Sequence, residues 1–183
     1  MYSVEPRRPL LKDRSLVIIV MGVVGAGKTT VGLLLAQKLG WRFADADDFH
    51  SPENKNKIRH GIPLTDADRA PWLTGLRHAI GQWNTQGQNV VLACSALKRA
   101  YRDELENDGK ERFVYLKGDY ELIATRLRAR HGHFATESIL RSQIADLEEP
   151  TDAIVLSIDK PPDAIVDEII AIVKTAYPDA VNK

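Results

Sequence analysis

The stretch at residues 22–30 constrains this chain more than any other part of the sequence. It reads GVVGAGKTT, which fits the phosphate-binding pattern G-x-x-x-x-G-K-[ST]. In this pattern the glycines allow backbone N–H groups to surround phosphate oxygens, Lys28 adds positive charge, and the hydroxyl of Thr29 can bind a divalent metal ion. The pattern therefore predicts a site for a nucleoside triphosphate.

The residues on either side of this loop support that prediction. Residues 16–21 form a short, β-branched apolar run, which is typical of a buried parallel strand. After the loop, apolar residues recur with helical spacing until Gly40, and glycine commonly ends a helix. A strand, a glycine-rich loop and a helix in this order place the helix N-terminus at the phosphates, where its dipole favours anions.

The rest of the chain predicts the fold class. Four further apolar segments are expected to be strands, at residues 41–44, 89–93, 112–116 and 153–158. Helical periodicity separates them, which predicts an α/β protein of three α/β/α layers around a five-stranded parallel sheet. We expect one domain at residues 15–183, preceded by a flexible extension at residues 1–14. The stretches at 46–88 and 117–152 are longer than a simple crossover, so they have room for a substrate-binding segment and a mobile lid.

Composition excludes some classes of function. Lys plus Arg and Asp plus Glu both number 25, and this balance gives no support to nucleic-acid binding. Cys94 is the single cysteine, so an intrachain disulfide cannot form. The sequence has no apolar stretch long enough to span a membrane and no signal-peptide core near its start. We therefore expect a cytoplasmic protein that binds neither nucleic acid nor a membrane.

Two acidic residues, Asp45 and Asp47, follow the second predicted strand. In an extended chain residues two apart project to the same side, and ligands of parallel sheets bind at the carboxyl ends of strands. Both carboxylates are therefore expected beside the phosphates, where one can hold water around Mg²⁺ and the other can accept a hydroxyl proton. Alternatively, these acids only precede a helix, since Ser51 and Pro52 form a typical helix start.

Several residues in the following connection have a structural interpretation. Asp68 fits the N-cap of a helix with Pro71 in its first turn, which does not exclude a second role for the acid. Trp72 and Trp83 fit the apolar stripe of that helix and are expected in the core. Three histidines lack the spacing of metal ligands and are interpreted as non-ligands: His50, His60 and His78.

Two longer segments are more specific than the phosphate loop, namely residues 66–73 (DADRAPWL) and 94–103 (CSALKRAYRD). Shorter ones follow at residues 113–116, 133–134, 142–143 and 147–148. With these segments the chain resembles the gluconate kinases, small P-loop kinases related in fold to shikimate and adenylate kinases. The resemblance covers residues 15–176 and implies transfer of phosphate from ATP to the 6-hydroxyl of D-gluconate, which gives 6-phospho-D-gluconate.

The resemblance also implies roles for individual residues. Asp47 resembles the catalytic base, and Lys28 and Arg130 complete the implied catalytic set. The implied metal ligands are Thr29 and Asp45, since no acid ends the third predicted strand. ATP is expected at Gly22, Gly25, Ala26, Gly27, Lys28, Thr29, Thr30, Arg126 and Arg130, the two arginines belonging to a lid at residues 126–136. Gluconate contacts are implied for Asp47, Lys57, Arg69, Ser95, Lys98 and Arg102.

Other interpretations stay open at this point. The chain could be another small P-loop kinase that acts on shikimate, a nucleoside monophosphate or a different sugar acid. It could also be a nucleotide-binding switch that signals through a partner, although the sequence has no [NT]-K-x-D guanine-specificity motif. Arg126 and Arg130 share one side of a helix and could instead form a solvated face. The sequence is compatible with a homodimer and does not require one.

Overall fold

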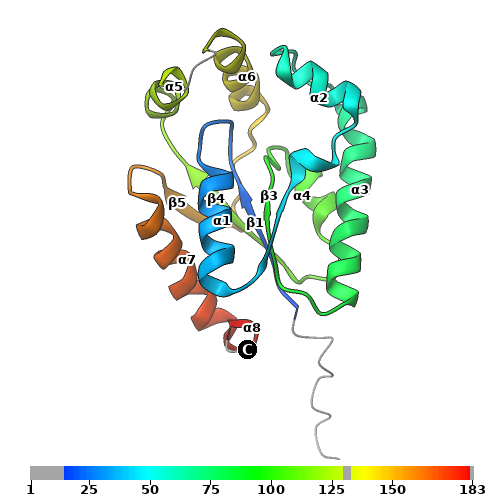
Figure 1. Ribbon diagram of the computed structural model, residues 1–183, viewed down its shortest axis with the longest axis vertical. Coiled ribbons are helices and arrows are strands. Elements are labelled where there is room, and N and C mark those ends of the chain that lie inside the picture. The colour runs from blue at the N-terminus through cyan, green and yellow to red at the C-terminus, as the bar shows by residue number, and fades with distance from the viewer. Residues whose placement is uncertain (1–14, 130–132, 182–183) are drawn as a thin grey trace, which may run out of the picture.

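The computed structural model describes residues 15–129 and 133–181, so the predicted extension at residues 1–14 lies outside the described residues. Its centre is a five-stranded parallel sheet with the order β2-β3-β1-β4-β5 (Figure 1). The strands are β1 (Val17–Met21), β2 (Arg42–Asp45), β3 (Val90–Ala93), β4 (Glu111–Lys117) and β5 (Ile154–Ser157). The predicted sheet is therefore confirmed, and each strand lies within two residues of its predicted bounds.

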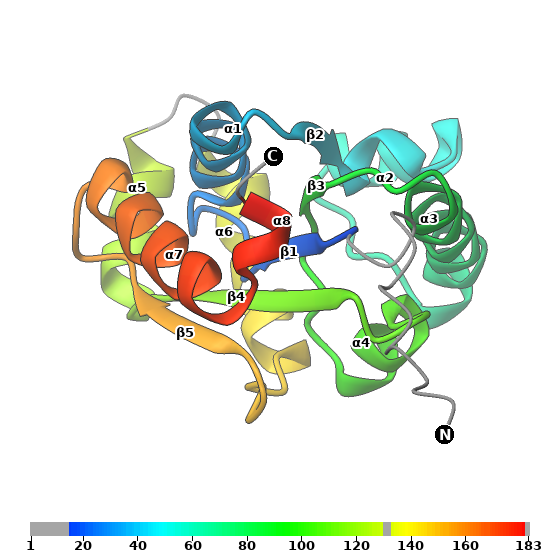
Figure 2. The same cartoon turned by 90° about the horizontal axis from the view of Figure 1, so that it is seen from below.

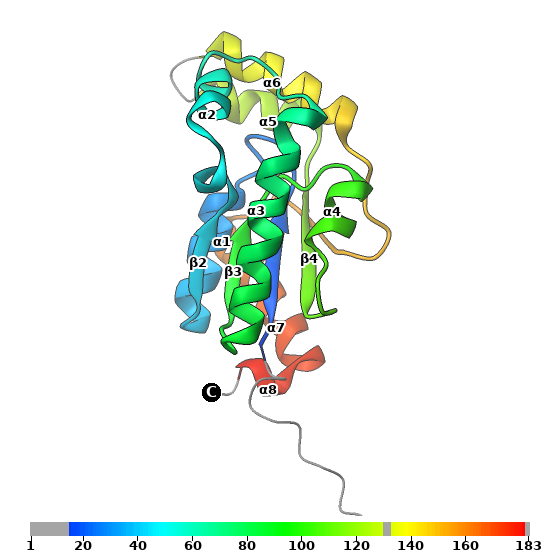
Figure 3. The ribbon, with the colours of Figure 1, turned by 90° about the vertical axis from the view of Figure 1, so that its right-hand side faces the viewer.

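Helices cover both faces of the sheet, which confirms the three predicted layers. They are α1 (Lys28–Leu39), α2 (Pro52–Arg59), α3 (Asp66–Thr85), α4 (Arg99–Leu105), α5 (Tyr120–Arg128), α6 (His133–Asp146), α7 (Pro162–Ala176) and α8 (Pro178–Val181), with a 3₁₀ helix, η2, at Ala46–Phe49. Helices α1 and α7 pack on one face, whereas α3 and α4 cover the other (Figures 2 and 3). Among the described residues, no helix is both long and apolar enough to cross a membrane.

Strand β1 is buried on both faces, which explains its uninterrupted apolar sequence. Ile18 and Val20 join the core beneath α1 and α7, while Ile19 and Met21 join the core beneath α3 and α4. Because successive side chains of a strand point to opposite faces, one strand supplies both cores. The phosphate loop therefore follows directly from the most buried strand of the sheet.

The two long connections form a cap over the carboxyl ends of the strands. Helix α2 comes from the first connection, and α5 and α6 come from the second; all three lie at the top of Figure 1. Residues 130–132, inside the predicted lid at 126–136, lie outside the described residues. The predicted surplus of chain is thus concentrated at the end of the sheet where ligands of parallel sheets bind.

Helix α3 begins earlier than the sequence predicts. Its N-cap is Thr65, whose hydroxyl accepts a hydrogen bond from the Asp68 N–H, while the Asp68 carboxylate accepts one from the Thr65 N–H. The prediction of Asp68 as N-cap was wrong because this reciprocal capping box satisfies two backbone donors and extends the helix by one turn. Pro71 consequently lies in the second turn, where it cannot donate to the carbonyl four residues earlier.

The burial of α3 yields a prediction about stability. Leu76 on α3 is 0% exposed, whereas Leu33 on α1 is 50% exposed. Leu76→Ala should lower the free energy of unfolding by about 2–5 kcal/mol, because it leaves a cavity in the core. Leu33→Ala should change it by less than about 0.5 kcal/mol. Urea denaturation followed by circular dichroism measures both values, and equal losses would contradict this assignment of the core.

Candidate active site

A cavity of about 270 Å³ opens at the carboxyl end of the sheet. Its walls are the phosphate loop, the acidic residues after β2, the start of α3, the loop after β3 and one side of α6. Each wall comes from a different part of the chain, and the sheet brings them together. The predicted residues Lys28, Asp47 and Arg69 all line this cavity.

The phosphate loop has the backbone geometry that its glycines predict. Gly25 and Gly27 have φ values of 81° and 97°, a left-handed conformation that other residues adopt only with strain. A Cβ at Gly25 would also lie 2.9 Å from side-chain atoms of Leu127, so α5 packs directly on this loop. No atom lies within 4 Å of a Cβ placed at Gly27, which is the N-cap of α1. This geometry leaves backbone N–H groups at a helix N-terminus available to an anion.

Lys28 lies inside the curve of this loop. Its ammonium donates to the Val23 carbonyl oxygen at 3.0 Å. Burial lowers the pKa of Lys28, and the negative charge of Asp47 opposes that shift. This hydrogen bond holds the lysine side chain at the loop. Ala26, another of the predicted loop residues, is buried.

The Asp45 carboxylate connects the phosphate loop with Asp47. One oxygen accepts the Thr29 hydroxyl at 3.1 Å, and the other accepts the Asp47 N–H at 3.0 Å. Asp45 thereby caps η2, so Asp47 stands on a 3₁₀ turn instead of the extended chain that the sequence suggests. Both carboxylates nevertheless line the same cavity, as predicted.

Thr29 and Asp45 are suited to a small divalent metal ion. Such an ion is commonly held by one or two protein oxygens and completes its shell with water and substrate phosphates. In the described part of the chain, no group of three or more His, Cys, Asp or Glu side chains could hold a metal without such help. The fit therefore depends on a bound phosphate, which the adjacent loop is built to provide.

Asp47 lines the cavity as an exposed residue, and the protein around it partly desolvates its carboxylate. This desolvation, followed by the negative charge of Asp45, raises its pKa above the usual value for an aspartate, while Lys28 acts in the opposite direction. A raised pKa makes the carboxylate a better proton acceptor. The arrangement suits a base that removes a proton from a hydroxyl beside the phosphates.

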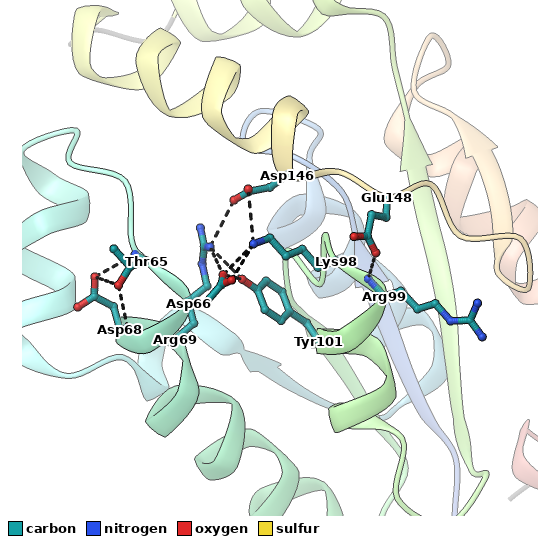
Figure 4. Close-up of polar contacts among 9 residues, drawn as sticks. All are labelled: Thr65, Asp66, Asp68, Arg69, Lys98, Arg99, Tyr101, Asp146 and Glu148. Carbon is teal, nitrogen blue, oxygen red and sulfur yellow. Dashed lines mark hydrogen bonds and ion pairs between the residues drawn. The ribbon is translucent and has the colours of Figure 1, made fainter.

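On the substrate side, Arg69 is the predicted cation that lines the cavity. Its Nη1 donates to the Tyr101 hydroxyl at 3.0 Å and to Asp146 at 3.3 Å, and it lies 3.6 Å from Asp66 (Figure 4). Lys98 contacts the same acids, with Nζ 2.8 Å from Asp66 and 3.8 Å from Asp146. Two cations from α3 and the start of α4 thus face two carboxylates from α3 and α6.

Other predicted substrate residues lie beside or behind the cavity. Ser95 lines it directly. Lys57 instead pairs with Asp68 at 2.7 Å. Arg102 is buried, and its Nη1 donates to the carbonyl oxygens of Ala96 and Leu97 at 3.1 and 2.9 Å. These contacts brace the loop that presents Ser95 to the cavity.

Ala96, in the same loop, has φ 44°, a left-handed conformation that is strained for a residue with a Cβ. It is also fully buried, and the contact from Arg102 to its carbonyl helps to hold this conformation. The structure thus gives Arg102 a supporting contact instead of a position in the cavity wall.

The predicted nucleotide arginines are only partly described. The Nη2 of Arg126 donates to the Ile158 carbonyl oxygen at 2.6 Å, which links α5 to the end of β5. Arg130 lies outside the described residues. The role of both side chains at the phosphates stays a prediction.

Sequence reasoning missed several residues of the cavity wall: His50, Tyr101, Ser142 and Gln143. Trp72, expected only in the core, is buried and also reaches the wall. The Gln143 side-chain oxygen accepts the N–H of Val24 in the phosphate loop at 2.6 Å. The segment at 142–143 enters the sequence analysis only through the resemblance, and its local pattern contains no signal for a contact made 119 residues away.

Cys94 also lines the cavity, but burial raises the pKa of its thiol to about 12, so it is no nucleophile.

Comparisons with known proteins agree with this geometry. Residues 24–174 match the family model described as Shikimate kinase. The gluconokinase of Gluconobacter oxydans (strain 621H) is 46% identical over 164 residues, covering 87% of this chain and 91% of that protein. The unliganded sugar kinase of Janibacter sp. HTCC2649 has a TM-score of 0.82 at 42% identity, covering 91% of this chain and 98% of that one. The gluconokinase of Sinorhizobium meliloti 1021 has a TM-score of 0.79 at 39% identity, covering 91% and 95%.

The fold and the site together define a small P-loop kinase. Within that class, the chain belongs to the gluconokinase family. The predicted activity class, an ATP-dependent phosphotransferase that acts on an alcohol, is thereby confirmed. The alternative of a nucleotide-binding switch is not favoured.

The position of Arg102 generates a test. Arg102→Met should lower the Tm by about 2–10 °C, because it removes the guanidinium donor from the buried Ala96 carbonyl and leaves the Leu97 carbonyl with the Glu148 N–H as its donor. Arg99→Met, at a side chain that is 80% exposed, is the matched control and should leave the Tm unchanged. Differential scanning calorimetry measures both. An unchanged Tm for Arg102→Met, with only a raised KM for the acceptor, would show that the residue contacts substrate instead.

Proposed function

We propose that this protein transfers the γ-phosphoryl group of ATP to the 6-hydroxyl of D-gluconate, which gives ADP and 6-phospho-D-gluconate. The observation that carries the proposal is one cavity lined by Lys28 of the phosphate loop, by the carboxylate of Asp47 and by the guanidinium of Arg69. Lys28 matches the phosphates of the donor, Asp47 matches the reacting hydroxyl, and Arg69 matches the carboxylate of the acceptor. The relatives named as gluconokinases support the same acceptor.

A linear sugar acid requires a cation at one end of its site and a base at the other. Arg69 suits the carboxylate end, because a guanidinium can form two parallel hydrogen bonds with a carboxylate. Asp47 suits the hydroxyl end, since it lies beside the phosphate loop and its raised pKa favours proton acceptance. Ser95, held by the braced loop after β3, adds a hydroxyl to the wall of the same cavity.

The metal of the reaction is proposed to be Mg²⁺, held by the Thr29 hydroxyl and, through water, by Asp45. When bound, Mg²⁺ neutralises charge on the phosphate oxygens during transfer. The chain's own contribution is mainly alignment: Lys28 is held at the loop, and Asp47 is held at a fixed offset from Asp45. We further propose that residues 126–136 form the lid, with Arg126 and Arg130 moving to the transferring phosphate.

The first test concerns the acceptor. In an ADP-release assay, kcat/KM for gluconate should exceed that for glucose by on the order of a hundredfold or more, because glucose leaves Arg69 without a carboxylate partner. Shikimate and AMP serve as acceptors of related kinases and should be poor substrates. A clear preference for any acceptor other than gluconate would reject the substrate and leave the kinase assignment in place.

The second test concerns the base. Asp47→Asn should lower kcat by about 10²–10⁴-fold with a much smaller change in the KM for gluconate, since the amide still forms hydrogen bonds but accepts no proton. Asp48→Asn is the matched control, because Asp48 is an exposed neighbour on η2 outside the cavity wall. Steady-state kinetics at saturating ATP and Mg²⁺ measure both variants. Equal effects of the two substitutions would argue against Asp47 as the base.

A further inference from the structure

His50 has an unusual position in the wall of the cavity. It directly follows η2, and its backbone N–H donates to the Asp47 carbonyl oxygen at 3.3 Å. Its ring stacks on the Trp72 indole with 4.6 Å between centroids and 12° between planes. The indole is itself anchored, because Trp72 Nε1 donates to the Ala46 carbonyl oxygen at 2.7 Å. The imidazole is therefore held rigidly, one turn from the proposed base.

One nitrogen of this ring is buried without a hydrogen-bond partner in the described part of the chain. His50 is 8% exposed, and its buried Nδ1 lacks any hydrogen-bond partner among the described residues. Buried polar groups in folded proteins are nearly always paired, so an unpaired one at a cavity wall requires an explanation. Within the described residues, Nδ1 is the ring nitrogen that is both enclosed and unpaired, and because His50 lines the cavity we assign Nε2 to the cavity side.

The charge on the ring follows from its surroundings. Burial, together with the positive charges of Arg69 and Lys55, lowers the pKa of His50 to about 4. The imidazole is thus neutral near pH 7 and carries one proton. A buried N–H without an acceptor is rarer in proteins than a buried acceptor without a donor. The proton is accordingly assigned to Nε2, which makes His50 a hydrogen-bond donor toward the cavity.

We propose that His50 is a specificity-determining residue that donates its Nε2–H to a hydroxyl oxygen of the polyol acceptor. It follows Asp47 by one turn and lies near Arg69, so it faces the part of a linear acid next to the reacting carbon, at the C4 or C5 hydroxyl. This inference rests on the proposed function for the identity of the acceptor. The site would then contain a neutral hydrogen-bond donor in addition to the base Asp47 and the cation Arg69. Such a donor would let the site recognise one particular hydroxyl of a long, flexible acceptor.

The competing explanation is that the ring serves only to pack on Trp72, and two substitutions separate the alternatives. His50→Phe keeps the aromatic stack and removes the donor. His50→Gln loses the stack but places an amide N–H near the position of Nε2. We expect His50→Phe to reduce kcat/KM for gluconate by about tenfold or more, mostly through KM, and His50→Gln to retain more of it. A larger loss in His50→Gln than in His50→Phe would overturn the proposal.

Deoxy acids make the test specific. The loss caused by His50→Phe should disappear with the gluconate analogue that lacks the contacted hydroxyl, 4-deoxy or 5-deoxy, and persist with the other. His78→Phe is the control substitution, because His78 lies on an exposed part of α3 and bonds to Gln82. A loss that is the same for gluconate and for both deoxy acids would assign the ring a purely structural role and overturn the proposal.

A measurement on the wild-type protein keeps the proposal testable if the variants fold poorly. With ¹⁵N-histidine labelling, saturating gluconate should shift the Nε2 resonance of His50 and leave that of His78 in place. Absence of a shift under conditions where gluconate is phosphorylated would overturn the proposal. If the wild type phosphorylates no gluconate but does phosphorylate another polyol, the proposed function fails, and the same titration with that acceptor still tests His50.

Discussion

The Asp45 carboxylate is the contact on which the geometry of the site depends. It accepts one hydrogen bond from Thr29 at the start of α1 and another from the Asp47 N–H at the start of η2. One short side chain therefore links the hydroxyl that is proposed to bind the metal with the candidate base. Because Asp45 ends β2, and β2 pairs with β3, this link is anchored to the edge of the sheet. The reacting groups gain their alignment from the sheet and not from a flexible loop.

The acceptor side of the cavity is organised differently, by an ion-pair cluster. Arg69 and Lys98 face Asp66 and Asp146, and the Tyr101 hydroxyl contacts Asp66 and Arg69. The cluster joins α3, α4 and α6, so it fastens the α6 part of the cap to α3 and α4 as well as presenting a cation. Two positive and two negative charges balance, which means that an incoming carboxylate competes with protein carboxylates for the same guanidinium. This competition favours the binding of an acceptor that also forms hydrogen bonds elsewhere in the cavity.

Much of this fold could be predicted from the sequence, because strands buried on both faces leave uninterrupted apolar runs such as that of β1. The phosphate loop and the pair Asp45 and Asp47 could also be predicted from the sequence, because local backbone geometry determines where the residues of a short motif lie. The N-cap of α3 was misplaced because Thr65 and Asp68 both fit the signal, and only the reciprocal contact between them decides it. Arg102 shows the limit for charged residues: a sequence does not reveal whether a cation faces a cavity or a buried carbonyl. His50 and Gln143 depend on contacts between distant segments, for which local spacing contains no information.

The hydrogen bond between Gln143 and the Val24 N–H has a thermodynamic consequence. It connects α6, which begins within the proposed lid segment, to a backbone donor of the phosphate loop. Any ligand on the loop that alters this bond changes the position that α6 prefers. By linkage, a shift of α6 must change the affinity of the loop for that ligand by the same factor. The amide side chain of Gln143 therefore couples α6 to the phosphate loop, in addition to the packing of α5 on Gly25.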